Sequence, residues 1–577
     1  MRVTTSKSKN SESFYITKAF IDKNKKSTSK IHRKLGTLAE LCKTLDTDRD
    51  GVMKWAKEEA ERETQKYNKE CEDVKIPFST TKIINKNETR SFNCGYLFLQ
   101  SLLYKLRIDN TFRNIKNRHD YKFDLSNIFS DLIYSRILHP SSKRETFKYS
   151  NTLLEQPLYD EHQVYRALSI LSKESDYIQS ELYKNSHFIH NRNTKILYYD
   201  CTNYYFEIEQ ADSLRKYGKS KENRPNPIVQ MGLFMDADGI PLAFDIFPGN
   251  QNEQKSLKPI EEKILRDFDC SEFIYCSDAG LGSKNNKMLN HLGGRSFLIT
   301  QSLKKLKKED LSIALSPKQY KRVGSDSFID LNDLDENDET TFNSIYYKKI
   351  PAESSIENET IVVTYSPKYK AYQEKIRDTQ IKRAENMISN GNKISKTHKN
   401  PNDPARFINK TSITENGEVA DKEIYKIDTD AINKEKKFDG FYAVTTDLDV
   451  DIAELVKINK RRWEIEECFR IMKTEFKARP VYLQREDRIK AHFLTCFVSL
   501  LLYRLLENKL NNKYTTTEIV NNLRNMNVCL IDGYGYIPTY TRTEFTDDLH
   551  EIFGFRTDKE IIKKAKMRNI ISYTKTT

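Results

Sequence analysis

The order of apolar segments between residues 195 and 300 restricts the fold more than any other feature of this chain. The order is a strand at 196–200, strands at 228–234 and 240–247, a helix at 253–267, a strand at 273–278, a helix at 284–292 and a strand at 296–300. The turn-rich run Asp236-Ala-Asp-Gly239 joins the second and third strands. This β-β-β-α-β-α-β order predicts a mixed sheet with its first and fourth strands adjacent and parallel.

The order is that of a ribonuclease-H-like domain, so we predict the α/β class. The chain has 577 residues, more than one core usually supports, and several structural units are expected. We predict a β-hairpin (14–35) plus helical DNA-binding region at 1–190, the first part of the catalytic core at 195–300, a mainly β insertion at 301–437, the second part of the core at 438–510 and a helical or irregular region at 511–577. A strand at 441–446 and a helix at 452–476 resume the core after the insertion.

The charge of the chain favours a polyanionic partner. Lys and Arg number 96 against 83 Asp and Glu, a formal net charge of +13, and the basic residues cluster. Nucleic acid fits better than a membrane, because the longest apolar run, 491–503, is too short to span a bilayer and indicates a buried core helix. The nine cysteines lack zinc-ligand spacing and are expected to be reduced thiols. Without an apolar leader at residue 1 the expected location is the cytoplasm.

The strand order predicts that two carboxylates lie side by side. Asp200 and Asp278 end the first and fourth strands, which lie side by side, so their side chains should be neighbours. A helix packed on the sheet after the insertion brings Glu466 to the same edge. Three convergent carboxylates repel one another unless cations compensate, and Mg²⁺ or Mn²⁺ prefers such oxygen ligands. The expected chemistry is phosphodiester cleavage with two ions per site. Taken singly, each Asp is more simply a structural residue at a strand end.

The segment 461–473 places one carboxylate among cations. At 3.6 residues per turn, Arg462, Glu466, Arg470 and Lys473 share one stripe of a helix, a pattern suited to metal and phosphate binding. The adjoining face carries the apolar residues Ile465, Phe469, Met472 and Phe476, which are expected to pack on the core. An amphipathic surface helix with a solvated charge stripe is the alternative.

Several stretches carry a family resemblance. They are Asp200-Cys-Thr-Asn-Tyr-Tyr-Phe-Glu, Asp278-Ala-Gly-Leu, Thr445-Thr-Asp-Leu, the spacing Arg462-x3-Glu466-x6-Lys473, and the segments 218–225 and 241–250. Together they resemble the DDE transposases of bacterial insertion sequences, in the branch with a Tyr-Arg-Glu-Lys signature, over about residues 95 to 510. The resemblance implies that Asp200, Asp278 and Glu466 bind the catalytic metals and that Arg462 and Lys473 contact DNA phosphates. It also implies a β-rich insertion before Glu466.

One position departs from the signature. Asn459 stands where the branch has its Tyr, three residues before Arg462, and offers only a shorter contact to DNA. Trp463 is expected to stack on a displaced base, with packed core bulk as an equal alternative.

Further DNA contacts are expected from a basic loop after the first strand. Lys219, Lys221 and Arg224 lie there, close in topology to Asp200, and a solvated loop is the alternative interpretation.

The sequence thus predicts a transposase that binds the double-stranded terminal inverted repeats of its own element, cuts them and joins them to target DNA. A homodimer on DNA is expected by analogy, in a bacterial cytoplasm and at the nucleoid when bound. Two rivals stay open: a metal-dependent nuclease that does not join strands, and a decayed or repurposed DNA-binding protein.

Overall fold

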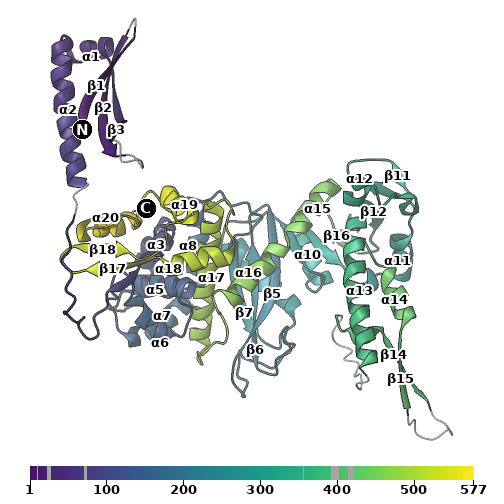
Figure 1. Ribbon diagram of the computed structural model, residues 1–577. Coiled ribbons are helices and arrows are strands. Elements are labelled where there is room, and N and C mark those ends of the chain that lie inside the picture. The colour runs from purple at the N-terminus through teal and green to yellow at the C-terminus, as the bar shows by residue number, and fades with distance from the viewer. Residues whose placement is uncertain are drawn as a thin grey trace. The chain divides into compact units, whose positions relative to one another are not determined.

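The computed structural model describes residues 1–8, 11–21, 27–70, 74–354, 356–390, 402–413 and 422–576. The chain forms two compact units, Met1–Glu88 and Thr89–Thr577 (Figure 1). The region 1–190, predicted as one module, is therefore divided between them.

The first unit is a three-stranded antiparallel sheet with two helices. Its elements are β1 (Arg2–Ser8), β2 (Ser11–Ile21), β3 (Ser27–Thr37), α1 (Leu38–Leu45) and α2 (Arg49–Glu70). Strands β2 and β3 form the hairpin that the sequence predicts, and β1 adds a third strand to it. Phe14, Leu41, Val52 and Ala56 form the core. The predicted basic tip at 22–26 lies outside the described residues.

The second unit contains a ten-stranded mixed sheet in the order β11-β10-β12-β13-β16-β9-β8-β5-β6-β7. Its central part is β5 (Ile196–Tyr205), β6 (Ile228–Met235), β7 (Pro241–Pro248), β8 (Ile274–Ser277) and β9 (Ser296–Gln301). Strands β5, β6 and β7 pair antiparallel, while β5 and β8 pair parallel. This is the predicted ribonuclease-H-like order. The strands appear in the sequence as nearly continuous apolar runs because helices cover both faces of the sheet.

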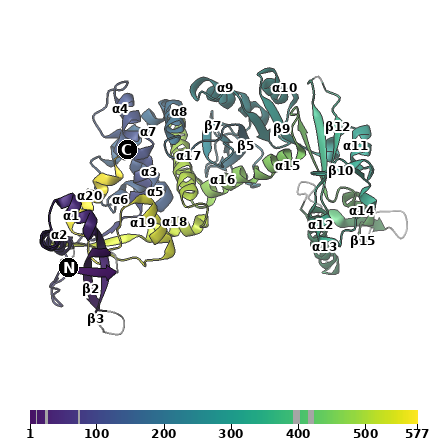
Figure 2. The same cartoon turned by 90° about the horizontal axis from the view of Figure 1, so that it is seen from above.

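Helices cover the two faces of the sheet. The 3₁₀ turn Glu253–Ser256 and helices α9 (Leu257–Asp267) and α10 (Lys284–Leu292) lie on one face. Helices α15 (Ile452–Arg461), α16 (Trp463–Thr474) and α17 (Glu486–Lys509) lie on the other (Figure 2). Leu197, Tyr199 and Cys201 of β5 pack toward α9, whereas Tyr198 and Tyr204 pack toward α16 and α17.

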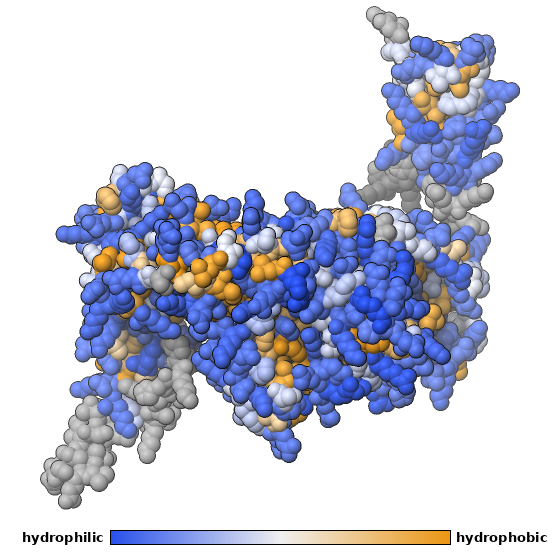
Figure 3. Space-filling view, turned by 180° about the vertical axis from the view of Figure 1, so that it is seen from behind, coloured by the Kyte–Doolittle hydropathy of each residue, from blue (hydrophilic) through white to orange (hydrophobic). Residues whose placement is uncertain are grey.

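The long helix α17 joins the sheet to a helical array. The array consists of α3 (Tyr96–Lys105), α4 (Ile108–Lys116), α5 (Leu125–Leu138), α6 (Lys143–Ser150), α7 (Glu161–Lys173) and α8 (Ser175–Ser186), with α18 (Thr516–Asn525) beside it. Helix α17 is long and apolar enough to cross a membrane by length and composition, but 89% of its apolar window is buried inside the protein. Figure 3 shows a face that hydrophilic residues mostly cover, with apolar residues in limited patches.

The insertion continues the sheet and adds helices. Its strands β10 (Tyr320–Arg322), β11 (Phe328–Ile329), β12 (Tyr346–Pro351) and β13 (Thr360–Tyr365) extend the sheet through β16 (Phe441–Thr446). Its other elements are α11 (Lys308–Leu315), α12 (Glu339–Asn343), α13 (Pro367–Ser389), α14 (Thr429–Lys436) and the hairpin of β14 (Ile408–Ile413) and β15 (Lys422–Ile427), with short 3₁₀ turns at 303–305, 331–333 and 404–407. The expectation of a mainly β insertion is therefore wrong, since the 23-residue helix α13 exceeds every strand.

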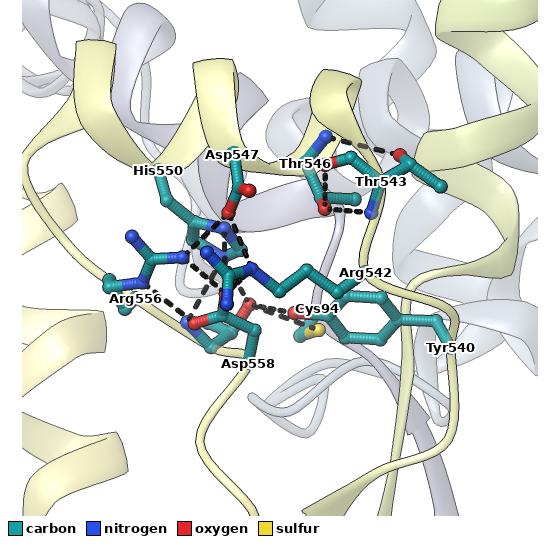
Figure 4. A network of polar contacts seen from close by, with 10 residues as sticks. Cys94, Tyr540, Arg542, Thr543, Thr546, Asp547, His550, Arg556 and Asp558 are labelled. Carbon is teal, nitrogen blue, oxygen red and sulfur yellow. Dashed lines mark hydrogen bonds and ion pairs between the residues drawn. The ribbon is translucent and has the colours of Figure 1, made fainter. Parts of the chain in front are cut away.

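The C-terminal segment folds back on the start of this unit. Strands β17 (Asn527–Ile531) and β18 (Gly535–Pro538) form a sheet with β4 (Ser91–Asn93), followed by α19 (Glu544–Phe553) and α20 (Lys564–Thr574). Figure 4 shows the polar network around Cys94, Tyr540 and His550 that closes this contact. All three side chains form hydrogen bonds with the Thr557 hydroxyl. Burial raises the pKa of the Cys94 thiol to about 12, so this cysteine stays protonated and serves packing.

Candidate active site

Two aspartates lie next to each other on adjacent parallel strands. The register pairs Tyr199 with Ser277, so the following residues, Asp200 and Asp278, are neighbours. Side chains alternate along β5, which places Asp200 on the face that Tyr198 and Tyr204 turn toward α16 and α17. Asp200 lies within β5 and not at its end as predicted, because the strand continues to Tyr205 in pairing with β6.

Glu466 comes to the same face on α16. The predicted continuous helix 452–476 is instead two helices that meet at Arg462, the residue between α15 and α16. The predicted apolar face is buried against the core, at Ile465, Phe469, Met472 and Phe476. Burial of this face leaves the Glu466 side chain 62% exposed.

Arg462 links two of the three carboxylates. Its guanidinium forms an ion pair and a hydrogen bond with Asp278, and its Nη1 lies 4.0 Å from Oε1 of Glu466. The Arg462 side chain is only 20% exposed. A cation of the chain itself therefore compensates Asp278 and Glu466, which the sequence argument did not anticipate.

Lys473 reaches the strand that carries Asp200. Its Nζ donates to Oγ1 of Thr202 at 2.6 Å and lies 3.7 Å from Oε1 of Glu222. Arg479 also forms an ion pair with Glu222. The expected stripe of three cations around Glu466 is thus spread out: Lys473 points to β5, and Arg470 instead pairs with Glu467.

The basic loop after β5 folds toward Asp200. The Lys221 ammonium donates to the carbonyl of Cys201 and lies 3.4 Å from Glu253. Burial lowers the pKa of Lys221, but the carboxylates Asp200 and Glu253 outweigh it, and the net shift is upward.

The surroundings of Asp200 favour its protonated form. Burial raises its pKa to about 6, the Asp278 charge adds to the rise, and Lys221 and the Cys201 amide at 2.7 Å oppose it. For Lys473, burial and, to a smaller extent, the neighbouring Lys221 charge lower the pKa to about 8, while Asp200 opposes this shift. A buried carboxylate beside a second carboxylate is an arrangement that an added cation would stabilise.

The carboxylate oxygens of Asp200, Asp278 and Glu466 are chemically suited to bind a hard divalent cation. Asp200 forms no ion pair within the part of the chain that the structure describes, and its ligand atoms are carboxylate oxygens, the type that Mg²⁺ and Mn²⁺ prefer. Across the described ranges, no group of three or more His, Cys, Asp or Glu side chains is gathered closely enough to hold a metal ion. In this structure the Arg462 guanidinium lies between Asp278 and Glu466.

The remaining predicted DNA contacts differ in exposure. Trp463 is 60% exposed at the start of α16, so it is not core bulk. Arg224 is exposed and lies 4.3 Å over the Tyr205 ring, and Lys219 is exposed on the same loop.

Asn459 is turned toward the sheet. Its Oδ1 accepts a 3.5 Å hydrogen bond from the Tyr442 hydroxyl.

Three residues of the site escaped the sequence argument: Glu222, Glu253 and Arg479. Glu253 acts electrostatically on Asp200, and Glu222 joins Lys473 to Arg479. Glu253 opens the helix that follows β7, and Glu222 lies within the basic loop. In the sequence, these residues are marked only by their closeness to segments that the sequence analysis had already selected.

Comparison with known proteins gives one family. A search of curated proteins finds no match. Among solved structures, a cryo-EM structure of the piggyBac transposase synaptic complex with hairpin DNA aligns at 9% identity and a TM-score of 0.34, covering 84% of this chain and 85% of that chain. An alignment at this level carries no argument. A family model described as the transposase DDE domain matches residues 202–502, which include Asp278 and Glu466 and begin two residues after Asp200. Because this match spans more than half of the 577 residues, the chain belongs to the family of transposase DDE domains.

Proposed function

We propose that this chain is the transposase of a bacterial insertion sequence. It binds the terminal inverted repeats of its element, cleaves at their ends and joins the freed 3′-hydroxyl to target DNA. The observation that carries this proposal is the placement of Asp200 and Asp278 on adjacent parallel strands, with Glu466 on the same face through Arg462.

Each side chain has a role in the proposed reaction. Asp200, Asp278 and Glu466 would hold two Mg²⁺ or Mn²⁺ ions, which supply Lewis acidity and positive charge for phosphodiester exchange when bound. Arg462, freed from the carboxylates, and Lys473, beside Thr202, would hold DNA phosphates. The exposed ring of Trp463 offers a stacking face beside them.

The partners follow from the reaction. Joining two ends requires both to be held together, so two copies of the chain are expected on the DNA. The region 1–190 would supply recognition of the repeats, and the complex would act at the bacterial nucleoid.

Asn459 favours one alternative. Its amide stands where the resembling branch has a Tyr, and its Oδ1 faces Tyr442. A decayed copy would bind DNA tightly in a salt-sensitive manner and yield no cut product. A nuclease that does not join would cut the repeats and leave no strand-transfer product.

The test is cleavage and joining of labelled repeat-end DNA in Mn²⁺ by the wild type and two variants. Glu466→Ala should abolish cutting and retain binding. Glu467→Ala, the matched neighbour that pairs only with Arg470 among described residues, should keep cutting. Cutting by Glu466→Ala at the normal rate would refute the assignment of Glu466.

A further inference from the structure

A basic cavity of about 340 Å³ lies beside the candidate active site. Its walls come from the turn between α5 and α6 and from the segment 477–483 that precedes α17. Four cationic side chains line it, namely Arg136, Lys143, Lys477 and Arg479, and no carboxylate is found among the described residues that line it.

Two of these cations are buried without a counter-charge. Lys143 is 5% exposed and Arg136 is 4% exposed. Within the described ranges, Lys143 Nζ, Arg136 Nε and the buried Oγ of Ser141 have no hydrogen-bond partner. Arg136 directs its other nitrogens to the carbonyls of Phe476, Lys477 and Ser141, which are neutral acceptors.

Such an arrangement destabilises the folded chain by itself. A buried ammonium without a partner loses its hydration and gains nothing in return, and a second cation nearby repels it. Burial and, to a smaller extent, the neighbouring Arg136 charge lower the pKa of Lys143 to about 7. His492, which also lines the cavity, is buried and donates its Nε2–H to the Ala478 carbonyl at 3.0 Å, so it supplies no negative charge.

The cavity connects to the active site through charged side chains. Arg479 lines the cavity and forms an ion pair with Glu222. Glu222 lies 3.7 Å from Lys473, which bonds Thr202, two residues after Asp200. Lys473 and Arg479, which share the carboxylate of Glu222, are therefore the two cations between the active-site strand and this cavity.

We propose that this cavity binds a phosphate group, with Lys143 and Arg136 as its counter-charges and Ser141 as a hydroxyl donor, and that the group belongs to the DNA backbone. A phosphate oxygen accepts from ammonium, guanidinium and hydroxyl donors alike, which satisfies all three unpaired atoms. The DNA source rests on the proposed function, while the phosphate chemistry does not.

The first test uses inorganic phosphate and thermal unfolding of the full chain in EDTA. At about ten times its Kd, phosphate should raise the Tm of the wild type by about 1–3 °C above chloride of equal ionic strength. Lys143→Met should lose this shift and should unfold no earlier than the wild type without phosphate, because it buries no unpaired charge. Lys148→Met, an exposed lysine on the same helix, should keep the shift.

The second test uses repeat-end DNA and fluorescence anisotropy over a range of salt concentrations. Lys143→Met should weaken binding about fivefold or more and lower the slope of log K against log salt by about one, while Lys148→Met keeps the wild-type slope. A phosphate shift with an unchanged DNA slope would support the cavity and overturn DNA as the source. Absence of both effects would overturn the proposal.

Failure of the proposed function is a separate outcome. A wild type that never cuts repeat DNA but keeps the Lys143-dependent phosphate shift would refute the transposase mechanism and leave the cavity assignment standing.

Discussion

Asp200→Asn should stabilise the metal-free protein while abolishing catalysis. The wild-type carboxylate is largely buried beside Asp278, and its pKa is about 6 in place of the ordinary 3.8. Asparagine keeps an acceptor for the Cys201 amide, which donates to Oδ1 at 2.7 Å, and removes the buried charge. Lys221 retains Glu253 at 3.4 Å as a partner in the variant.

The pKa gives the size of the effect. One pKa unit corresponds to about 1.4 kcal/mol, so ionising Asp200 in the folded chain costs about 3 kcal/mol at pH 7. The folded pKa lies above the unfolded value, so this penalty is nearly absent below about pH 4, grows between pH 4 and 6 and is constant above. The gain in unfolding free energy from Asp200→Asn should be about 3 kcal/mol at pH 7, about 1.5 at pH 5 and about 0.5 at pH 4.

Urea unfolding of wild type and variant in EDTA at these three pH values measures the gain. The control is Asp236→Asn, the same chemical change at a fully buried aspartate of the same unit. Asp236 pairs with Arg192, so its loss should destabilise by about 3–5 kcal/mol.

Added Mg²⁺ should stabilise the wild type and leave Asp200→Asn unchanged. A lower stability of Asp200→Asn at pH 7 in EDTA, or a gain independent of pH, would show that the carboxylate is held for structure and would refute the reasoning.

Three further predictions concern DNA binding. Burial holds the pKa of Lys473 near 8, so its charge is lost as pH rises from 7 to 9; affinity for repeat ends should fall over this window in the wild type and stay level in Lys473→Arg, as measured by anisotropy. In Mn²⁺, which is proposed to free the Arg462 guanidinium from Asp278 and Glu466, Arg462→Ala should lower the salt slope of binding by about one. Arg470→Ala should not, because Glu467 is no proposed metal ligand and keeps the Arg470 guanidinium paired; equal slopes would contradict the different roles. Asn459→Tyr should bind repeat ends about tenfold more tightly with an unchanged Tm, because Asn459 lines a cavity of about 580 Å³ with room for the ring; a fall in Tm would show that the ring does not fit.

Local sequence pattern predicted most of the central sheet. Helices 125–138 and 284–292 and strands 361–365 and 441–446 lie where periodicity or β-rich composition placed them, within one or two residues. These signals are local, because a buried strand or an amphipathic helix records its own burial in its residue pattern. The neighbourhood of Asp200 and Asp278 followed from strand order, since parallel pairing of β5 and β8 fixes it.

Tertiary structure decided what local pattern does not contain. The helix predicted at 452–476 is interrupted at Arg462. Arg462 pairs with Asp278, a residue 184 positions away in the sequence. Two other contacts also join distant segments. Strand β13 of the insertion pairs with β16 of the core, and Arg136 donates to the backbone carbonyls at 476–477. Charged residues in a helical or polar run show the same pattern whether they end in solvent, in an ion pair or unpaired in a cavity. Only the folded chain distinguishes these environments, because desolvation and pairing depend on which distant segments pack together.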